Sequence, residues 1–423
     1  KMMKRLRSTE IAEANRAATV FTALVNGLSP SLAAFFILTP FAAAALGMVS
    51  MADAYTGSIA LSFASFFLFG VFIIGQAFEE SGYLAYLSYR FFKKAKTANM
   101  LVVYIIFGMG ILSAFLMNDT IAIIGTPVVL SLAGKMDIQP KVLLLALAFA
   151  VTTGSVMSPI GNPQNLLIAV HGDMANPFVT FFEFLLVPTI INLFFAYLLV
   201  RLFYRKQFHT GPLHHDEASI VDSNLAKLAR VSLVLLVVMV LVKIIIVFVG
   251  LEVDFRLTYI ALVSALPVVL LSRKRFGIIR RIDWYTLVFF AAMFVLMASV
   301  WNSGYFQELM ASMHLDLASR SIIMAVSVLL SQLISNVPLV ALYLPVLGEI
   351  GGSTAALMAL AAGSTIAGNL TILGAASNVI IIQNAEKSSG VTLTFWDFIR
   401  VGAPLTVINV AVYWLFLSLW SGG

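Results

Sequence analysis

Long apolar runs dominate this chain and predict a series of membrane-spanning helices. A helix needs about 20 mostly apolar residues to cross the hydrocarbon core of a bilayer. A mixed segment at residues 11–28 predicts a helix lying along the cytoplasmic membrane surface. The uninterrupted apolar runs after it cover residues 31–49, 58–78, 178–202, 228–249, 257–271, 284–300 and 395–420.

Two further pairs of apolar arms meet at polar tips. Arms at residues 101–117 and 121–133 flank Asn118-Asp119-Thr120, and two later arms meet at Ser335-Asn336-Val337. The pattern predicts two helical hairpins. A re-entrant hairpin and a pair of full spans both return the chain to the same side, so charge bias alone does not separate them.

Two more apolar runs are interrupted by small and amide residues. The runs cover residues 142–170 and 353–383, and their breaks lie at residues 161–165 and 374–378. Backbone N–H and C=O groups lose their helix partners at such a break. They are tolerated at membrane depth only where protein or a water-filled cavity surrounds them. We therefore expect two interrupted helices at a binding site, with a simple kink held by Asn and Ser as the alternative.

These features belong to an internal repeat. Four blocks recur in the same order, at offsets of 222, 218, 213 and 214 residues. The matches are Ser81-Gly82-Tyr83 with Ser303-Gly304-Tyr305; Leu112, Ser113, Asn118, Pro127 and Val128 with Leu330, Ser331, Asn336, Pro345 and Val346; Gly161 and Asn165 with Gly374 and Asn378; and Thr180, Glu183 and Phe184 with Thr394, Asp397 and Phe398. Ordered blocks with a slowly drifting offset predict two equivalent halves.

Composition agrees with a polytopic membrane protein. Hydrophobic residues make up 61% of the 423 residues and charged residues 11%, and the mean hydropathy is +0.98. Both values lie far from those of soluble domains. The chain has no cysteine, which excludes disulfides and thiolate metal sites.

The net charge of +6 reflects basic loops and does not indicate a nucleic-acid partner. Lys and Arg cluster at residues 90–96, 201–206 and 273–281, whereas residues 51–57 and 302–316 are poor in them. Because basic loops stay in the cytoplasm, we expect a multi-pass protein of the inner (plasma) membrane. Its N-terminus would be cytoplasmic and its C-terminus outside.

This assignment puts the first Ser-Gly-Tyr block inside and the second outside. The expected fold is therefore all-α, with two inverted-topology repeats, each containing a re-entrant hairpin and an interrupted transmembrane helix. That is the plan of secondary transporters. The predicted parts are a cytoplasmic N-terminal segment (residues 1–30), a first repeat (31–206), a cytoplasmic linker (207–225) and a second repeat (226–423).

Asp119 is the candidate coupling residue. A carboxylate at membrane depth is costly and marks an ion path or proton relay by default; the alternative is a structural carboxyl hydrogen-bonded at a hairpin tip. The second hairpin has Asn336 and no acid, which suggests one titrating site. The candidate substrate-binding residues are Asn118, Asp119, Thr120, Gly161, Asn162, Asn165, Ser335, Asn336, Gly374, Ser377 and Asn378.

The sequence argues against other functional classes. No P-loop pattern occurs, so the chain is not its own ATPase, and the histidines do not form a metal-ligand pattern. An intramembrane enzyme would need a second catalytic group at the depth of Asp119, and none is found, so we expect no enzyme. A passive channel remains an alternative, which solute accumulation against a gradient would exclude.

At the two tips and two breaks the chain resembles the ion transporter superfamily, over residues 66–408. That group includes arsenite/antimonite permeases, sodium/proton antiporters, and citrate and dicarboxylate carriers. The resemblance implies re-entrant hairpins and a site between tips and breaks. The Ser-Asn-Thr and Pro-Pro-Asn signatures of dicarboxylate carriers are altered here. Asn118-Asp119, with Phe78-Glu79-Glu80-Ser81-Gly82 upstream, looks more like arsenite permeases.

The expected function is proton-coupled efflux of arsenite or antimonite by alternating access. The alternatives are a sodium/proton antiporter and a sodium-coupled carrier of citrate, dicarboxylate or sulfate. No cofactor is expected; the coupling ion would be H⁺, with Na⁺ as the alternative. Partners would be the lipid bilayer, a small inorganic solute or anion and, as the resemblance implies, a soluble ATPase. The uninterrupted residues 228–271 could serve as a scaffold or homodimer surface.

Overall fold

The computed structural model describes most of the chain after residue 67. The surface helix predicted at residues 11–28, the span at 31–49 and most of the linker at 207–225 lie outside the described residues. Every regular element among the described residues is a helix. These residues are 68–83, 86–87, 95, 97–136, 138–172, 174–208, 220–249, 257–282, 284, 287–288, 297, 300–312 and 315–419.

The first half begins with a helix over residues 68–80. Both predicted arms are helical, and the first contains a π-helical segment. The elements are α6 (Ala98–Tyr104), η2 (Ile105–Met109), α7 (Gly110–Leu116), α8 (Asn118–Met136), α9 (Pro140–Ser155), α10 (Pro163–His171), α11 (Pro177–Phe203) and η3 (Arg205–Gln207).

The second half repeats this order from α17 to α21. Its elements are α12 (Ser223–Phe248), α13 (Leu257–Leu271), α14 (Arg275–Arg281), α16 (Tyr305–Ser312), α17 (Arg320–Ile334), α18 (Asn336–Glu349), α19 (Thr354–Ile366), η4 (Ala367–Asn369), η5 (Ile372–Gly374), α20 (Ala376–Ser389) and α21 (Phe395–Leu419). Among the described helices, four are long and apolar enough to cross a membrane: Ala98–Leu116, Pro177–Phe203, Ser223–Ile246 and Phe395–Leu419.

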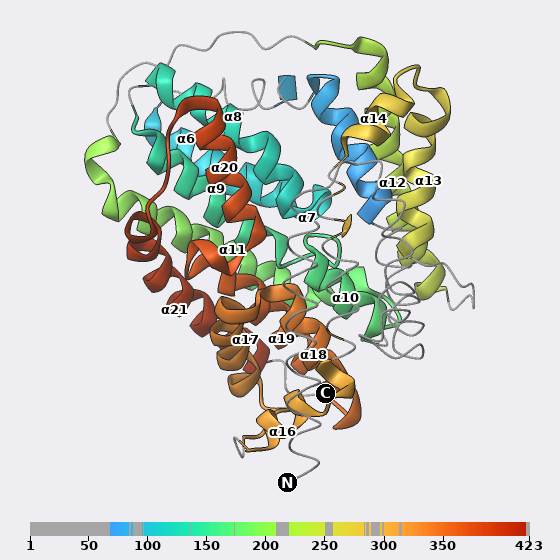
Figure 1. The fold of residues 1–423 in the computed structure, drawn as a ribbon, viewed down its shortest axis with the longest axis vertical. Coiled ribbons are helices and arrows are strands. Elements are labelled where there is room, and N and C mark those ends of the chain that lie inside the picture. The colour runs from blue at the N-terminus through green and yellow to red at the C-terminus, as the bar shows by residue number, and fades with distance from the viewer. Residues whose placement is uncertain are drawn as a thin grey trace, which may run out of the picture.

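The helices form two groups. Residues 68–80 pack with α12, α13 and α14 at one side of the molecule (Figure 1). Gly70 lies against the backbone of Ala261, the ring of Phe69 is 5.8 Å from that of Trp284, and the Val221 N–H donates to the Ser81 carbonyl. The remaining helices, apart from α16, gather around α9 and α19. We call the first group the side group and the second the core group.

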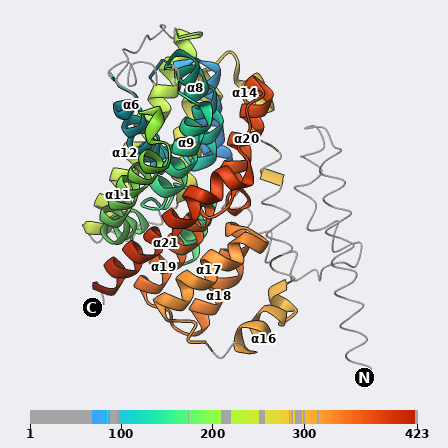
Figure 2. The same ribbon diagram turned by 90° about the vertical axis from the view of Figure 1, so that its left-hand side faces the viewer.

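The two hairpins lie at opposite ends of the core group. Both views show α6 and α8 in the upper part and α17 and α18 in the lower part (Figures 1 and 2). The halves are interlocked, because α10 packs on α18 and α20 packs on α8.

Helices α9 and α19 are the centre of the core group. Residues 142–155 of α9 and 356–366 of α19 are buried throughout. Small residues allow close crossings: Gly154 of α9 meets the backbone of Gly110 in α7, and Gly363 of α19 meets Met324 and Ser327 of α17. Close approach at small residues is typical of helix pairs in membranes.

The structure changes two details of the sequence analysis. Both breaks begin earlier than residues 161 and 374: α9 ends at Ser155 and α19 ends at Ile366. Amide side chains bind carbonyls that lie at or just after these two ends, as described below. Asp397 lies in the first turn of α21, whereas its repeat mate Glu183 lies beyond the first turn of α11, where Asn176 is the cap.

Candidate polar site at the two hairpin tips and two helix breaks

The two hairpin tips share an unusual backbone. Met117 has φ 64° and ψ 144°, and Ser335, which lies 218 residues later, has φ 72° and ψ 164°. Among the described non-glycine residues, these two are the ones with positive φ. This region is almost restricted to glycine and costs about 1–3 kcal/mol. Such strain is often stored at functional sites.

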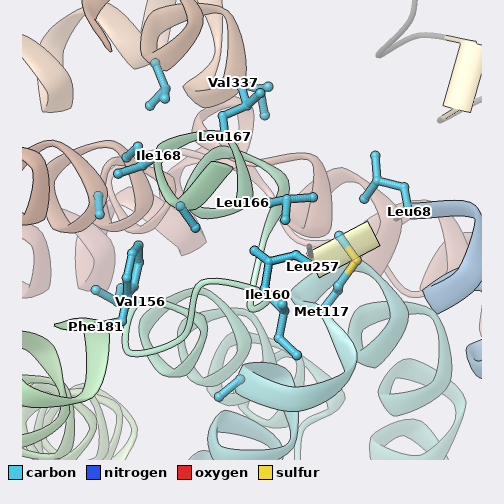
Figure 3. Packing of buried hydrophobic residues seen from close by; sticks show 14 of the residues in the cluster. Leu68, Met117, Val156, Ile160, Leu166, Leu167, Ile168, Phe181, Leu257 and Val337 are labelled. Carbon is cyan, nitrogen blue, oxygen red and sulfur yellow. The ribbon is translucent and has the colours of Figure 1, made fainter. Parts of the chain in front are cut away.

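The first tip contacts the first break. The Asn118 backbone N–H donates to the Gly161 carbonyl at 2.8 Å, and the Asn118 Oδ1 accepts from the Asp119 N–H at 2.9 Å. Asn118, Asp119 and Thr120 are all buried. Helix α8 therefore begins inside the protein, beside Ile160 and Met117 (Figure 3).

Asn162 and Asn165 hold the first break together. The Asn162 Oδ1 accepts from the Asn165 N–H at 2.8 Å and so caps α10. The Asn165 Nδ2 donates to the carbonyls of Ser155, Val156 and Ser158 at 3.0–3.2 Å. These carbonyls are freed where α9 ends, so the side chain replaces lost helix hydrogen bonds. Gly161 approaches the Ser155 carbonyl too closely for a Cβ.

An asparagine side chain also holds the second break together, and here a glutamine from the second hairpin adds to it. The Asn378 Nδ2 donates to the carbonyls of Gly368 at 2.7 Å and Thr371 at 3.3 Å. Gln332, from the second hairpin, adds a donor to the Ala367 carbonyl at 2.9 Å and accepts from the Thr371 hydroxyl at 2.7 Å. A Cβ on Gly374 would meet the Ala367 carbonyl oxygen and Gln332.

Thr365 of α19 connects the two halves at the first break. Its Oγ1 accepts from Asn162 Nδ2 and Gln164 Nε2, both at 3.3 Å, and donates to Asn165 Oδ1 at 3.3 Å. All four residues are at most 3% exposed. The hydroxyl therefore lies between three amide groups.

A second connection links α9 of the first half to the break of the second half. The Asn369 Nδ2 donates to the Thr153 Oγ1 of α9 at 3.0 Å and to the Asn409 Oδ1 of α21 at 2.9 Å. Gly402 of α21 lies directly on the Asn369 carbonyl. Each break is thus held partly by the central helix of the other half.

The second tip and break retain unpaired acceptors. Among the described residues, Asn336 Oδ1, Asn369 Oδ1, Asn378 Oδ1 and Ser377 Oγ are buried without a hydrogen-bond partner. The Asn378 amide orientation is set by its two carbonyl acceptors, so its free atom is an oxygen. Helix α20 also begins without a side-chain cap at Ala375. Buried unpaired groups of this kind indicate a place for a ligand or water.

Asp119 and Thr120 face a different neighbour. The two residues line a cavity of about 40 Å³ together with Gln76 and Glu79. A Cβ on Gly75 would be 2.9 Å from the Thr120 methyl. The acid of the first tip therefore faces the side group, whereas the amides of the first break face α19.

The apolar wall of the site comes from both halves. Leu166, Leu167 and Ile168 of α10 lie between Ile160 of the first break and Val337 of the second hairpin tip (Figure 3). The first half-helix and the second tip therefore share one hydrophobic contact surface.

The sequence analysis missed several residues that the structure brings to the site. Thr365, Asn369 and Gln332 were not considered. One signal was available for Thr365: it follows Thr152 by 213 residues, the offset of the breaks. Among the described residues, no group of three His, Asp or Glu side chains could hold a metal ion.

Relatives of the chain are membrane transporters. An uncharacterized transporter of Mycobacterium bovis is 27% identical over 373 residues, which cover 84% of this chain and 85% of that protein. The silicon efflux transporter LSI3 of Oryza sativa subsp. japonica is 24% identical over 433 residues, covering 86% of this chain and 88% of that protein.

A solved structure supports the all-helical transporter fold. The YdaH transporter of Alcanivorax borkumensis superposes with a TM-score of 0.54 at 15% identity, covering 93% of this chain and 98% of that one. The family model described as "Citrate transporter" (CitMHS) matches residues 18–355. The protein is therefore a secondary transporter and not an enzyme, and the chain belongs to the citrate transporter (CitMHS) family.

Proposed function

We propose that this protein exports arsenite or antimonite in exchange for protons, by alternating access between two inverted repeats. Asp119 would carry the proton. The polar pocket would comprise Asn118, Thr120, Gly161, Asn162, Asn165, Ser335, Asn336, Gly374, Ser377 and Asn378. The observation that carries this proposal is the set of buried, unpaired acceptor oxygens at the second tip and break.

The inverted arrangement has structural support. The hairpin α17–α18 lies at the opposite end of the core group from α6–α8, and α10 and α20 are exchanged between the halves (Figure 2). Together with basic loops on one side, this favours two repeats of opposite orientation, an N-terminus in the cytoplasm and a C-terminus outside.

Helix lengths favour a re-entrant hairpin in the second half, whereas the 19 residues of Ala98–Leu116 in the first hairpin are enough to cross a membrane. Helices α17 and α18 contain 15 and 14 residues. At 1.5 Å per residue each reaches roughly 22 Å, which is less than the ~30 Å hydrocarbon core. Hairpins of this length would place Ser335 and Asn336 within the membrane.

The chemistry of the pocket favours an uncharged hydroxide. Arsenite at neutral pH is mostly a neutral trihydroxide, whose O–H groups donate hydrogen bonds. The free atoms at Asn336, Asn369 and Asn378 are acceptors, so they match O–H donors. An ionised polycarboxylate has acceptor oxygens but no matching donors, so it would bind these free acceptor atoms poorly. The rice relative is named for silicon efflux, and dissolved silicon is also a neutral hydroxide.

A sodium-coupled anion carrier is the second candidate. The family description names citrate, and the uncapped start of α20 presents the positive end of a half-helix. Amide and hydroxyl oxygens also suit a cation. In this alternative, sodium would bind the free acceptors first, and citrate would bind only in its presence.

Transport in proteoliposomes tests both candidates. The purified chain would be reconstituted with an imposed pH gradient, and uptake of arsenite, antimonite and citrate would be followed with and without sodium. We expect accumulation of arsenite driven by the pH gradient alone and abolished in D119N. Arsenite uptake that ignores the pH gradient would reject proton coupling. Sodium-dependent citrate uptake would replace the proposal with the second candidate.

A further inference from the structure

The helix over residues 68–80 ends in two adjacent acids with different surroundings. The Glu80 Oε1 is 3.4 Å from Arg281 Nη1 of α14 and accepts from Gln76 Nε2 at 3.3 Å. Glu79 has no ion-pair partner in the described part of the chain, and its side chain is exposed at the helix end.

Glu79 of the helix over residues 68–80 and Asp119 of α8 line one cavity. Its wall also includes Gln76, Thr120 and Ile123, and its volume is about 40 Å³. A cavity needs roughly 10–15 Å³ of this measure to hold one water, so a water can occupy the cavity that the two residues share. The contact of Gly75 with Thr120 holds the two helices close at this point.

Asp119 needs a route to water if it exchanges protons. Its side chain is 5% exposed, so bulk water does not reach it directly. Glu79 is exposed and shares its cavity. The titratable and charged groups around Glu79 are Glu80 on the same helix, Asp119 on α8, and Arg281 on α14 through its pair with Glu80.

We propose that Glu79 is the residue through which protons enter and leave Asp119. In the loading step, a hydronium ion gives a proton to the Glu79 carboxylate and leaves as water. The Glu79 carboxyl then gives its proton to a cavity water, which passes one of its own to the Asp119 carboxylate. Glu79 returns to its ionised form and Asp119 becomes neutral. The reverse sequence unloads Asp119, and this inference rests on the proton coupling proposed above.

The proposed relay predicts that a substitution at Glu79 changes the rate of proton transfer but not the pH dependence of arsenite binding at equilibrium. E79Q removes the carrier but leaves Asp119 titratable, so the pH profile of arsenite binding should keep its midpoint. The rate of proton uptake after a pH jump should fall at least tenfold, because each transfer must bypass position 79. E80Q is the matched control, since Glu80 neighbours Glu79 but is paired with Arg281.

The experiment uses the full chain in proteoliposomes with a trapped pH indicator. We expect arsenite-linked proton flux to be fast in wild type and E80Q, slow in E79Q, and restored in E79A by added formate, a small weak acid that can replace the lost carboxyl. Equal flux in E79Q and wild type would overturn the relay, as would equal slowing in E79Q and E80Q or E79A that formate does not rescue. A wild-type protein without arsenite-linked proton flux would instead refute the coupling, and the relay with it.

Discussion

Asn165 and Asn378 perform the same task in the two halves. Each donates its side-chain Nδ2 to the backbone carbonyls ten and seven residues before it, which are Ser155 and Ser158 for Asn165 and Gly368 and Thr371 for Asn378. A helix can end inside the membrane only if its last carbonyls find donors. Each asparagine donates to carbonyls at or just after the end of a central helix, so the two side chains hold the chain that follows α9 and α19.

Replacing either asparagine by alanine should destabilise the protein. N165A leaves three buried carbonyls without this donor and should lower the free energy of unfolding by about 2–4 kcal/mol, and N378A by about 1–3 kcal/mol. The measurement is the thermal unfolding midpoint in detergent. N384A, on the partly exposed face of α20, is the control and should change stability by less than about 0.5 kcal/mol. Equal effects of N378A and N384A would contradict the role of Asn378.

The hydroxyl of Thr365 should matter while that of Thr152 should not. T365V keeps the shape of the side chain but removes the partner of Asn162, Gln164 and Asn165, so we expect a loss of about 1–3 kcal/mol. Thr152 occupies the matching place in the first half, and its Oγ1 has no hydrogen-bond partner among the described residues. T152V should therefore be neutral or stabilising.

T365S supplies the control for Thr365, because it restores the hydroxyl in a smaller side chain. Thermal midpoints and arsenite binding by calorimetry would be compared across the three variants. A T152V protein that loses as much stability as T365V would show that both hydroxyls are paired and would contradict this interpretation.

The sequence analysis predicted the repeat, the tips and the breaks because they depend on local patterns. Apolar arms, amide-rich interruptions and a constant offset are visible in one dimension. Thr365 and Asn369 were missed because their roles depend on α19 meeting α10 and on η4 meeting α9 and α21. Periodicity does not specify which helices cross between halves. Glu79 was missed for the same reason, since its neighbour Asp119 lies on another hairpin.

A glycine at position 335 should relieve strain at the second tip. Ser335 has φ 72° and ψ 164°, and its side chain is partly exposed. S335G should raise the free energy of unfolding by about 1 kcal/mol, since glycine adopts this conformation freely. S335V should lower it. If the strain keeps the tip in one geometry, S335G should also slow arsenite transport, which proteoliposome uptake measures. A lower midpoint in S335G would contradict the strain.

The start of α12 should be sensitive to low pH through Asp222. The Leu225 backbone N–H, together with Lys274, holds the pKa of the Asp222 carboxyl below its ordinary value of 3.8. Because the folded pKa is lowered, the stabilisation is complete above that ordinary value and is lost as the pH falls through the lowered folded pKa. D222A should cost about 0.5–1 kcal/mol at neutral pH, mostly through the cap, since the partly exposed ion pair with Lys274 is screened.

The check is a pair of stability curves against pH. Wild type and D222A should differ most at neutral pH, and the part of the difference due to the charge should disappear in strong acid, where Asp222 is protonated. D222S keeps a capping oxygen without a charge and should recover most of the difference. Curves that stay parallel down to strong acid would show that the Asp222 charge has no part in stability.

Gly402 should be essential for the contact between α21 and the second break. A Cβ at this position would collide with the backbone carbonyl oxygen of Asn369. A backbone atom cannot rotate away, so either α21 or η4 must shift, and the hydrogen bonds of Asn369 to Thr153 and Asn409 would stretch. We expect G402A to lower the unfolding free energy by about 1–3 kcal/mol and to reduce arsenite uptake. G348A is the matched control, because its Cβ would meet nothing within 4 Å, and alanine is the better helix former. The second break is the part of the pocket with free acceptors, so a G402A protein that transports at the wild-type rate would show that the position of η4 does not control the site.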